Sequence, residues 1–169
     1  LPVISETGTL SNTYLFKYFT ELYENNISSF SIFLKSSNSL KGEDIKLSER
    51  IFLPSSRLRG FERGKIGPKD GDDYIGGNYA ASINFSSTIP QILENAENID
   101  FLLFFDVGNV WGVDYFSGDD EGSKIRSSAG VGMDWLTPIG PLNFTFATAL
   151  SKANSDKTQT FSFNLGTSF

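Results

Sequence analysis

The feature that most constrains this chain is an alternation of apolar and polar residues with a period of two. In the segment 125–135, one face carries Ile125, Ala129, Val131, Met133 and Trp135, whereas the other carries Arg126, Ser128, Gly130, Gly132 and Asp134. Consecutive side chains of a β-strand point to opposite faces, so this pattern predicts a strand with one apolar and one polar face. The same alternation is found in the segments 14–22, 29–35, 78–88, 99–111, 142–150 and 161–169. The sequence therefore predicts an all-β, antiparallel fold of about seven strands with no convincing helix.

The strand lengths and the connections favour a barrel that spans a membrane. Most of the predicted strands are close to the ~9–11 residues with which a tilted strand crosses a bilayer. Short turns at 25–26 and 137–141 alternate with long polar connections at 111–124 and 151–158. The connection at about 38–75 is the longest, and connections of this length are usually functional or disordered. Short turns on one side and long loops on the other are typical of outer-membrane barrels.

Two environments could cover the apolar faces, namely the interior of a soluble sandwich or the lipid of a membrane. The polar faces contain mainly Ser, Asn, Gly and Thr, whereas a soluble sheet would display more Lys and Glu. The charged residues lie mainly in the connections, and the apolar content is concentrated in 16 Phe. We therefore expect lipid on the apolar faces and a wet lumen on the polar faces. The residues expected to point outward are Phe101, Leu103, Phe105, Val107, Val131, Met133, Phe144, Phe146, Phe161, Phe163 and Leu165.

The composition excludes several functional classes. The 169 residues include no His and no Cys, which excludes thiol nucleophiles, disulfides, Ser-His-Asp catalysis and zinc sites built from these residues. A net charge of −6 argues against nucleic acid as a partner. The acidic loops 70–73 and 119–121 could bind Ca²⁺ weakly, but their spacing matches no specific calcium loop. Solvated loops are the favoured interpretation, so the residues predict no metal and no cofactor.

The strand count indicates an incomplete barrel. Bacterial barrels contain an even number of strands, from ~8 upward, so about seven strands do not complete one. Residues 1–4 look like the tail of a preceding strand, and the chain opens on Leu1 without Met or a basic leader. We therefore expect residues 1–169 to be the C-terminal part of a larger barrel whose N-terminal strands are missing.

An ordered set of short motifs accompanies the predicted strands. The longest connection contains Leu58-Arg59-Gly60-Phe61 and then Ile66-Gly67-Pro68, and the segment 104–108 reads F-x-D-x-G. Gly140-Pro141-Leu142 opens the penultimate strand, and the chain ends in an aromatic strand. Together these motifs resemble the C-terminal barrel of the BamA family of outer-membrane assembly proteins, whose relatives include TamA, two-partner secretion transporters and the mitochondrial sorting and assembly barrel. The resemblance covers essentially the whole chain and is strongest over 57–169.

The resemblance implies a contact between the long loop and the barrel wall. In this family the loop folds into the lumen, and the arginine of R-G-F meets the F-x-D-x-G strand. The loop-to-wall motif would here comprise Arg59, Gly60, Phe61, Phe104, Asp106 and Gly108. Independently of the family, Phe104, Asp106 and Gly108 share the lumenal parity of their strand, and Gly108 leaves space beside the wall. A charge in a confined lumen needs a partner. Without the resemblance, a solvated arginine and a strand-ending aspartate would be the simpler interpretation.

The last strand is the second candidate site. Its aromatic alternation resembles the C-terminal sorting signal of outer-membrane barrels, and an ordinary lipid-facing strand has the same pattern. In the BamA family this strand also closes weakly against the first strand and so forms a lateral gate. Gly166 would suit a weak seam, because glycine packs poorly in a strand and can kink it. The signal and gate residues are Phe161, Phe163, Leu165, Gly166 and Phe169.

The resemblance implies a physical activity and no enzyme chemistry. An integral barrel in the outer membrane of a Gram-negative bacterium would open laterally and template the strands of incoming barrel proteins. Its partners would be nascent outer-membrane β-barrel proteins, outer-membrane lipid and accessory assembly lipoproteins. The lipoproteins would bind through periplasmic POTRA domains, which are absent from this sequence.

Three other classes stay open at this point. A TamA-like barrel or a two-partner secretion pore would carry the same motifs, although I-G-P and F-D-V-G-N-V-W favour the BamA type. The barrel could also be the tail of a patatin-like phospholipase, whose catalytic domain would lie upstream. A passive porin is disfavoured because a loop folded into the lumen obstructs conduction.

Overall fold

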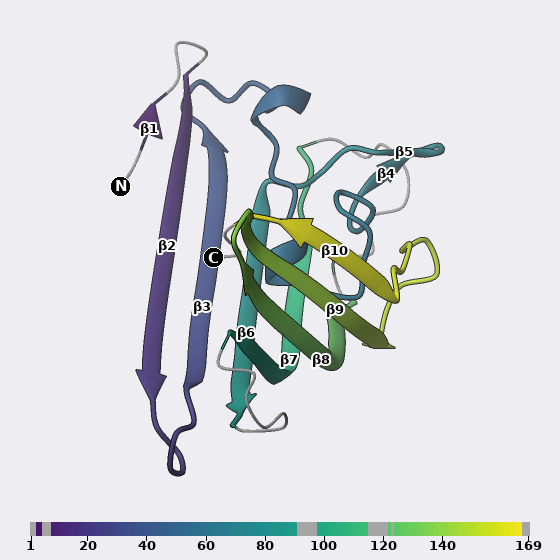
Figure 1. The fold of residues 1–169 in the computed structure, drawn as a ribbon. Coiled ribbons are helices and arrows are strands. Elements are labelled where there is room, and N and C mark those ends of the chain that lie inside the picture. Colours follow the sequence, from purple (N-terminus) through teal and green to yellow (C-terminus); the bar gives the residue numbers. More distant parts are fainter. Residues whose placement is uncertain (1–2, 5–7, 91–97, 115–121, 123, 167–169) are drawn as a thin grey trace.

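The computed structural model describes residues 3–4, 8–90, 98–114, 122 and 124–166, and it contains one large curved sheet (Figure 1). Eight strands follow one another in the order β1-β2-β3-β6-β7-β8-β9-β10, and all neighbours are antiparallel. The strands are β1 (Val3–Ile4), β2 (Thr9–Thr20), β3 (Ser28–Ser39), β6 (Tyr79–Ile89), β7 (Ile99–Trp111), β8 (Arg126–Thr137), β9 (Gly140–Ser151) and β10 (Phe161–Leu165). The all-β prediction is confirmed, with seven longer strands and the two-residue β1 at the edge. No helix in the described part of the chain has the length and apolarity needed to cross a membrane.

Strand boundaries differ from the prediction where both faces of a strand are polar. β2 begins at Thr9, five residues before the first alternating residue, Tyr14. Its first residues pair with the end of β3, with Thr9 opposite Ser39. Because Thr, Ser and Asn occupy both faces there, no apolar alternation marks the strand. Backbone pairing therefore extends β2 and β3 beyond the part of each strand that the alternation identifies.

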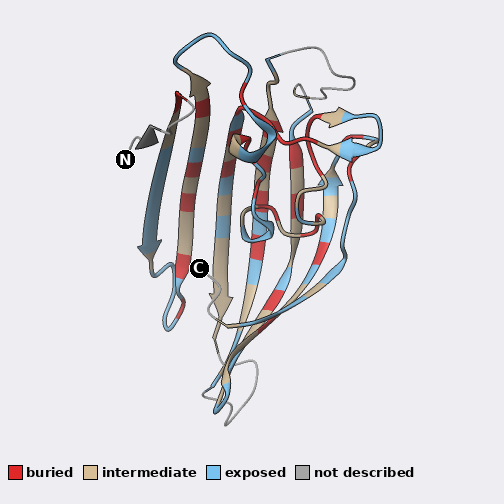
Figure 2. Cartoon of the chain, turned by 90° about the horizontal axis from the view of Figure 1, so that it is seen from above, coloured by how far each residue is buried: buried red, intermediate tan, exposed pale blue. Residues whose placement is uncertain are grey.

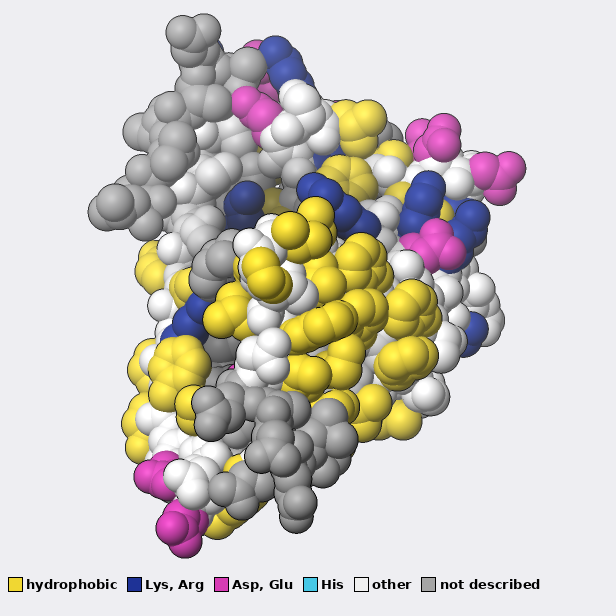
Figure 3. Space-filling model, viewed as in Figure 1, with side chains coloured by type: hydrophobic (Ala, Val, Ile, Leu, Met, Phe, Trp, Pro, Cys, Tyr) yellow, Lys and Arg dark blue, Asp and Glu magenta, His cyan; other side chains and the backbone are white. Residues whose placement is uncertain are grey.

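The apolar side chains predicted to point outward lie on the convex face of the sheet. Phe30, Phe85 and Phe105 occupy successive positions of one cross-strand row. Phe146 is 54% exposed, and the hydrophobic side chains over β8, β9 and β10 form a continuous surface (Figure 3). These rings cover the outside of the sheet instead of filling a core between two sheets. Their arrangement matches an apolar face turned toward lipid.

The connection between β3 and β6 folds back against the concave face of the sheet. It contains two short 3₁₀ turns, η1 (Leu47–Glu49) and η2 (Ser55–Arg57), and a hairpin of β4 (Lys69–Asp70) and β5 (Asp73–Tyr74). The main buried cluster lies between this connection and the strands, where buried positions concentrate (Figure 2). It comprises Ile51, Leu53, Leu58, Phe61 and Ile66 from the connection, with Phe33, Ala80 and Val110 from the strands. We call residues 40–78 the inner loop.

Candidate functional site

Asp106 on β7 is the centre of the contact between the inner loop and the wall. Its side chain is completely buried, and its carboxylate accepts four hydrogen bonds. Arg59 donates from Nε to Oδ2 at 2.7 Å and from Nη2 to Oδ1 at 2.7 Å, and its backbone N–H donates to Oδ2 at 3.0 Å. The amide of Asn84 on β6 donates to Oδ1 at 2.9 Å. This paired, fork-shaped arrangement satisfies a buried charge that would otherwise be costly.

The Arg59 guanidinium is also stacked on an aromatic ring. Its Cζ lies 3.7 Å from the centroid of the Phe104 ring, which is within the range of a cation–π contact. Gly130 on β8 is opposite Phe104 and makes room for this ring. A Cβ at Gly130 would lie 2.7 Å from Phe104 Cζ and 2.1 Å from the carbonyl oxygen of Phe146. The ring and the carboxylate together fix both the plane and the position of the guanidinium.

The two residues that follow Arg59 bring the inner loop against the far strands. Gly60 has a φ of 87°, which favours glycine, and a Cβ there would lie 3.0 Å from Cβ of Ala147. Phe61 is buried and forms an isolated β-bridge with Thr158 in the β9–β10 connection. Gly108 leaves the space that the sequence suggested, because a Cβ there would lie 2.9 Å from Cδ2 of Leu53. All six residues of the predicted loop-to-wall motif thus lie along the interface between the inner loop and the sheet.

Two polar residues of this site were missed by the sequence reasoning. Asn84 donates to both Asp106 and the carbonyl oxygen of Arg57, so it links wall and loop. It has lumenal parity in the sequence, but only the strand register places it directly opposite Asp106. Arg57 lies over the Phe33 ring, with Cζ 5.2 Å from the centroid. Burial lowers the pKa of the Arg57 guanidinium from its ordinary value.

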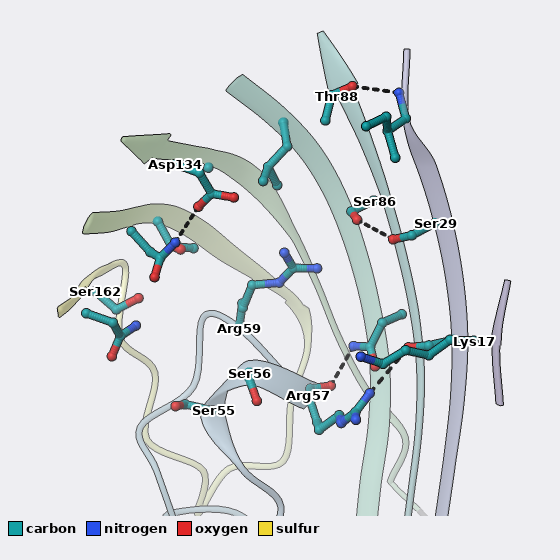
Figure 4. A pocket seen from close by; sticks show the side chains of 18 of the residues that line it. Lys17, Ser29, Ser55, Ser56, Arg57, Arg59, Ser86, Thr88, Asp134 and Ser162 are labelled. Carbon is teal, nitrogen blue, oxygen red and sulfur yellow. Dashed lines mark hydrogen bonds between the residues drawn. The ribbon is translucent and has the colours of Figure 1, made fainter. Parts of the chain in front are cut away.

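A cavity of about 750 Å³ lies on the concave side, next to the part of the inner loop that Arg59 attaches to the wall (Figure 4). Its wall contains many small polar side chains, including Ser29, Ser86 and Ser162, together with Lys17 and Asp134. Such a lining suits a water-filled lumen. Within the described residues, no three acidic side chains gather closely enough to hold a metal ion.

A second buried ion pair, also missed, lies where β7 ends and β8 begins. Arg126 and Asp156 both have completely buried side chains. Arg126 donates from Nε to Oδ2 at 2.9 Å and from Nη2 to Oδ1 at 3.0 Å. Its Nη1 donates to the carbonyl oxygen of Lys124 at 3.0 Å and to Oδ1 of Asn109. The polar parity of Arg126 and the acidic residue in the 151–158 connection were the available signals, but nothing in the sequence paired them.

The C-terminal strand β10 is short and has one described neighbour. Phe161–Leu165 pairs with Leu142–Phe146 of β9, and the Phe163 ring lies 5.1 Å from the Phe144 ring, centroid to centroid. Gly166 has a φ of 114°, and its N–H donates to the carbonyl oxygen of Pro141 at 2.9 Å. The backbone therefore leaves strand geometry at the glycine that the sequence singled out. Phe169 lies outside the described residues.

Several known proteins are similar to this chain in sequence. The outer membrane protein assembly factor BamA of Neisseria meningitidis is 33% identical, with a match that covers 66% of this chain and 17% of that protein. BamA of Neorickettsia risticii is 32% identical, with a coverage of 76% and 18%. A SAM50-like protein of Schizosaccharomyces pombe is 30% identical, with a coverage of 68% and 26%. This chain thus spans less than a fifth of the length of the two BamA relatives.

The fold matches a solved barrel of the same kind. The crystal structure of BamA from Haemophilus ducreyi lacking POTRA domains 1–3 superimposes with a TM-score of 0.81 at 25% sequence identity. The match covers 94% of this chain and 35% of that one. The BamA relatives are named outer membrane protein assembly factors, and the outer-membrane localisation predicted from the sequence agrees with them. Because residues 6–169 match the Omp85 superfamily domain, the chain belongs to the Omp85 superfamily.

Proposed function

We propose that this chain is the C-terminal part of a barrel that inserts and folds other β-barrel proteins in the outer membrane. The observation that carries the proposal is the short pairing of β10. It pairs with β9 over five residues and its backbone leaves strand geometry at Gly166, so the seam that its other edge would form in the whole barrel is short and opens easily. An unpaired strand edge presents N–H and C=O groups that can pair with another chain. Such an edge can template the first strand of an incoming barrel protein.

The loop-to-wall contact has a supporting role in this proposal. A barrel that opens along one seam must keep its shape elsewhere while the edge is exposed. Arg59 and Asp106 join the inner loop to the wall by two charge-assisted hydrogen bonds between side chains, and Phe104 supports the guanidinium. Gly60, Phe61 and Gly108 allow the close approach of loop and wall. We therefore assign the motif a holding role in assembly, and we assign the aromatic residues of β10 a role in sorting and gating.

The proposal implies no bond-breaking chemistry and no cofactor. The partners of the whole protein would be nascent outer-membrane β-barrel proteins, the surrounding lipid, and accessory lipoproteins that bind to periplasmic POTRA domains elsewhere in the protein. The relatives named BamA are several times longer than this chain, so a complete assembly protein has room for such domains. Nucleic acid is not a partner in this proposal, in keeping with a net charge of −6.

Cysteine cross-linking in the full-length protein tests the proposal. Asn164→Cys places a thiol on β10, and Thr145→Cys places one on β9, which is paired on both sides. With a client barrel protein that carries a single cysteine in its first or last strand, we expect disulfide cross-links to Asn164→Cys during assembly and few to Thr145→Cys.

Two results would contradict the proposal. Normal client assembly without any cross-link to β10 would remove β10 as the template. Cross-linking of a passing polypeptide to Thr145→Cys as readily as to Asn164→Cys, since both positions line the cavity, would instead favour a secretion pore.

A further inference from the structure

The buried ion pair of Arg126 and Asp156 lies outside the loop-to-wall motif, yet it holds the chain segment that leads into β10. Asp156 belongs to the β9–β10 connection, and its Oδ2 also accepts a hydrogen bond from the Ala153 N–H at 2.6 Å. Arg126 is the first residue of β8. Both groups are fully buried, so the pair fixes one end of the connection to the wall with little freedom.

The residues that follow Asp156 pair with the inner loop along their backbone. The N–H of Lys157 donates to the carbonyl oxygen of Lys65 at 3.1 Å, and the N–H of Glu62 donates to the carbonyl oxygen of Lys157 at 3.0 Å. The N–H of Gln159 donates to the carbonyl oxygen of Gly60 at 3.0 Å. We call residues 157–160 the strap. It connects the inner loop directly to the strand that begins at Phe161.

The strap is also attached to β9 at its last residue. The N–H of Ala147 donates to the carbonyl oxygen of Thr160 at 2.8 Å, immediately before the β9–β10 ladder begins at the Phe146–Phe161 pair. The strap therefore has three attachments: the Arg126–Asp156 pair, the backbone of the inner loop, and β9. Gly60 follows Arg59 in the chain, so the strap lies one residue away from the Arg59–Asp106 contact.

We infer that Arg126 and Asp156 are positioning residues for β10, and that the strap couples them to the Arg59–Asp106 contact. This inference rests on the proposed function only in its consequence, namely that the edge offered to a client is held in place from inside the barrel. A change at either ion pair shifts the strap, and the strap sets where β10 begins. The inner loop thus acts on the edge strand through backbone hydrogen bonds, without touching a client.

Hydrogen exchange of the full-length protein in membranes tests the coupling. Asp156→Asn leaves the Arg126 charge buried without its partner, and we expect at least tenfold faster exchange at the amides of the strap and of β10. Exchange in β3 and β6, which do not contact this ion pair, should stay at the wild-type rate, whereas a general loss of stability would raise it there too. Asp72→Asn, the same change at an exposed acid in the β4–β5 hairpin, should leave all rates unchanged. Arg126→Lys keeps the positive charge but cannot make the paired hydrogen bonds of the guanidinium, so it should give an intermediate effect on exchange. This variant replaces Asp156→Asn in the experiment if Asp156→Asn does not fold.

A double variant separates coupling from mere proximity. If the strap connects the two ion pairs, Asp106→Asn with Asp156→Asn should accelerate strap exchange by less than the product of the single effects. Multiplying effects would show two independent contacts and overturn the coupling, as would acceleration confined to the residues around Asp156. Client assembly is measured separately. If the unmodified protein fails to assemble clients while the variants show the expected exchange pattern, the proposed function is refuted and this inference stands.

Discussion

Asp106 and Phe104 together form a binding site whose geometry suits the planar guanidinium of an arginine. The carboxylate lies at the edge of the Arg59 guanidinium, and the ring lies under its face. A lysine could approach the carboxylate, but its ammonium has no plane to stack and no second donor in a fixed direction. Neutralising either partner leaves the other charge in a largely enclosed place, because the Arg59 side chain is 20% exposed and Asp106 is completely buried.

Substitution of Asp106 should therefore destabilise the full-length barrel. We expect Asp106→Asn to lower the free energy of unfolding by roughly 3 kcal/mol, the lower end of the cost of breaking a buried pair, because Arg59 keeps some contact with water. Arg59→Lys should cost less, and exchanging the charges at both positions should recover part of the loss. Thermal unfolding in detergent measures these differences, with Asp72→Asn as the control. Wild-type midpoints for both single variants would show that the contact does not hold the loop.

Crowding beneath the guanidinium should matter as much as charge. Gly130→Val would push against the Phe104 ring and the backbone of β9, because a Cβ there already lies 2.7 Å from Phe104 Cζ and 2.1 Å from the carbonyl oxygen of Phe146. We expect a loss of about 1–3 kcal/mol in unfolding free energy, together with weaker protection of the Arg59 region from exchange. Ala129→Val, which places the same side chain on the outward face at the preceding residue, should be close to neutral.

The sequence could predict only those contacts of the site that short motifs and the alternation along one strand indicate. The pairing of Arg59 with Asp106 followed from the family resemblance that their two motifs carry, whereas parity alone placed Asp106 on the lumenal face. Asn84 joins them through strand register, which pairs it with Asp106 across two strands and leaves no trace in either segment alone. The same holds for Arg126 and Asp156, which are 30 residues apart and meet through the folding of a connection.

The two faces of most long strands lie in different environments, one suited to lipid and the other to water. Phe105 is 43% exposed on the convex face of β7, whereas Thr145 on β9 lines the cavity on the concave face. The alternation predicted this division along most of the long strands, because a different environment on each face imposes a period of two. In β2, Leu15 and Phe19 occupy the face opposite to Tyr14, Phe16 and Tyr18. The inner loop has no such period, so its contribution of Leu53, Leu58 and Ile66 to the main buried cluster could not be predicted from the pattern.

Introducing the same side chain on opposite faces tests the division. We expect Phe105→Arg to destabilise the barrel in lipid vesicles by about 2–4 kcal/mol, the cost of a cation in the middle of the bilayer on the lipid face. Thr145→Arg should cost much less, because the cavity is lined by polar groups and is open to water. Urea titration of the folded full-length protein in vesicles compares the two variants. Equal losses would mean that the convex face does not meet lipid.

At the scale of the whole molecule, the sheet curves around its own loop. The main cluster of buried apolar residues lies between the inner loop and the concave face, so loop and wall stabilise one another. The sheet alone has a convex face of exposed rings and a concave face of small polar residues. In an integral outer-membrane protein, lipid covers the first and the inner loop covers part of the second.

The position of the inner loop predicts a specific pattern of proteolysis. In intact membranes, trypsin added from outside should cleave after Lys41, which is exposed at the start of the inner loop. The Arg59–Gly60 bond should resist, since it is enclosed by the wall and by the strap. Asp106→Asn should make that bond cleavable. Rapid cleavage after Arg59 in the unmodified, closed barrel would contradict the folded-back position of the loop.

The small residues of the concave wall also determine how the barrel tolerates change. Where Gly108 and Gly130 of the wall and Gly60 of the inner loop meet their neighbours, a single added methyl group would lie 2.1–3.0 Å from the nearest atom. On the convex face, exchanging a whole ring for another bulky apolar side chain alters contacts with fluid lipid and with neighbouring rings, such as Phe144 beside Phe163, but not with the backbone of the wall. The size of a substitution is therefore a poor guide to its effect in this protein. The face of the sheet on which a residue lies determines how well the residue tolerates substitution. The positions that tolerate it least are the glycines of the concave wall, where there is no room for a larger side chain.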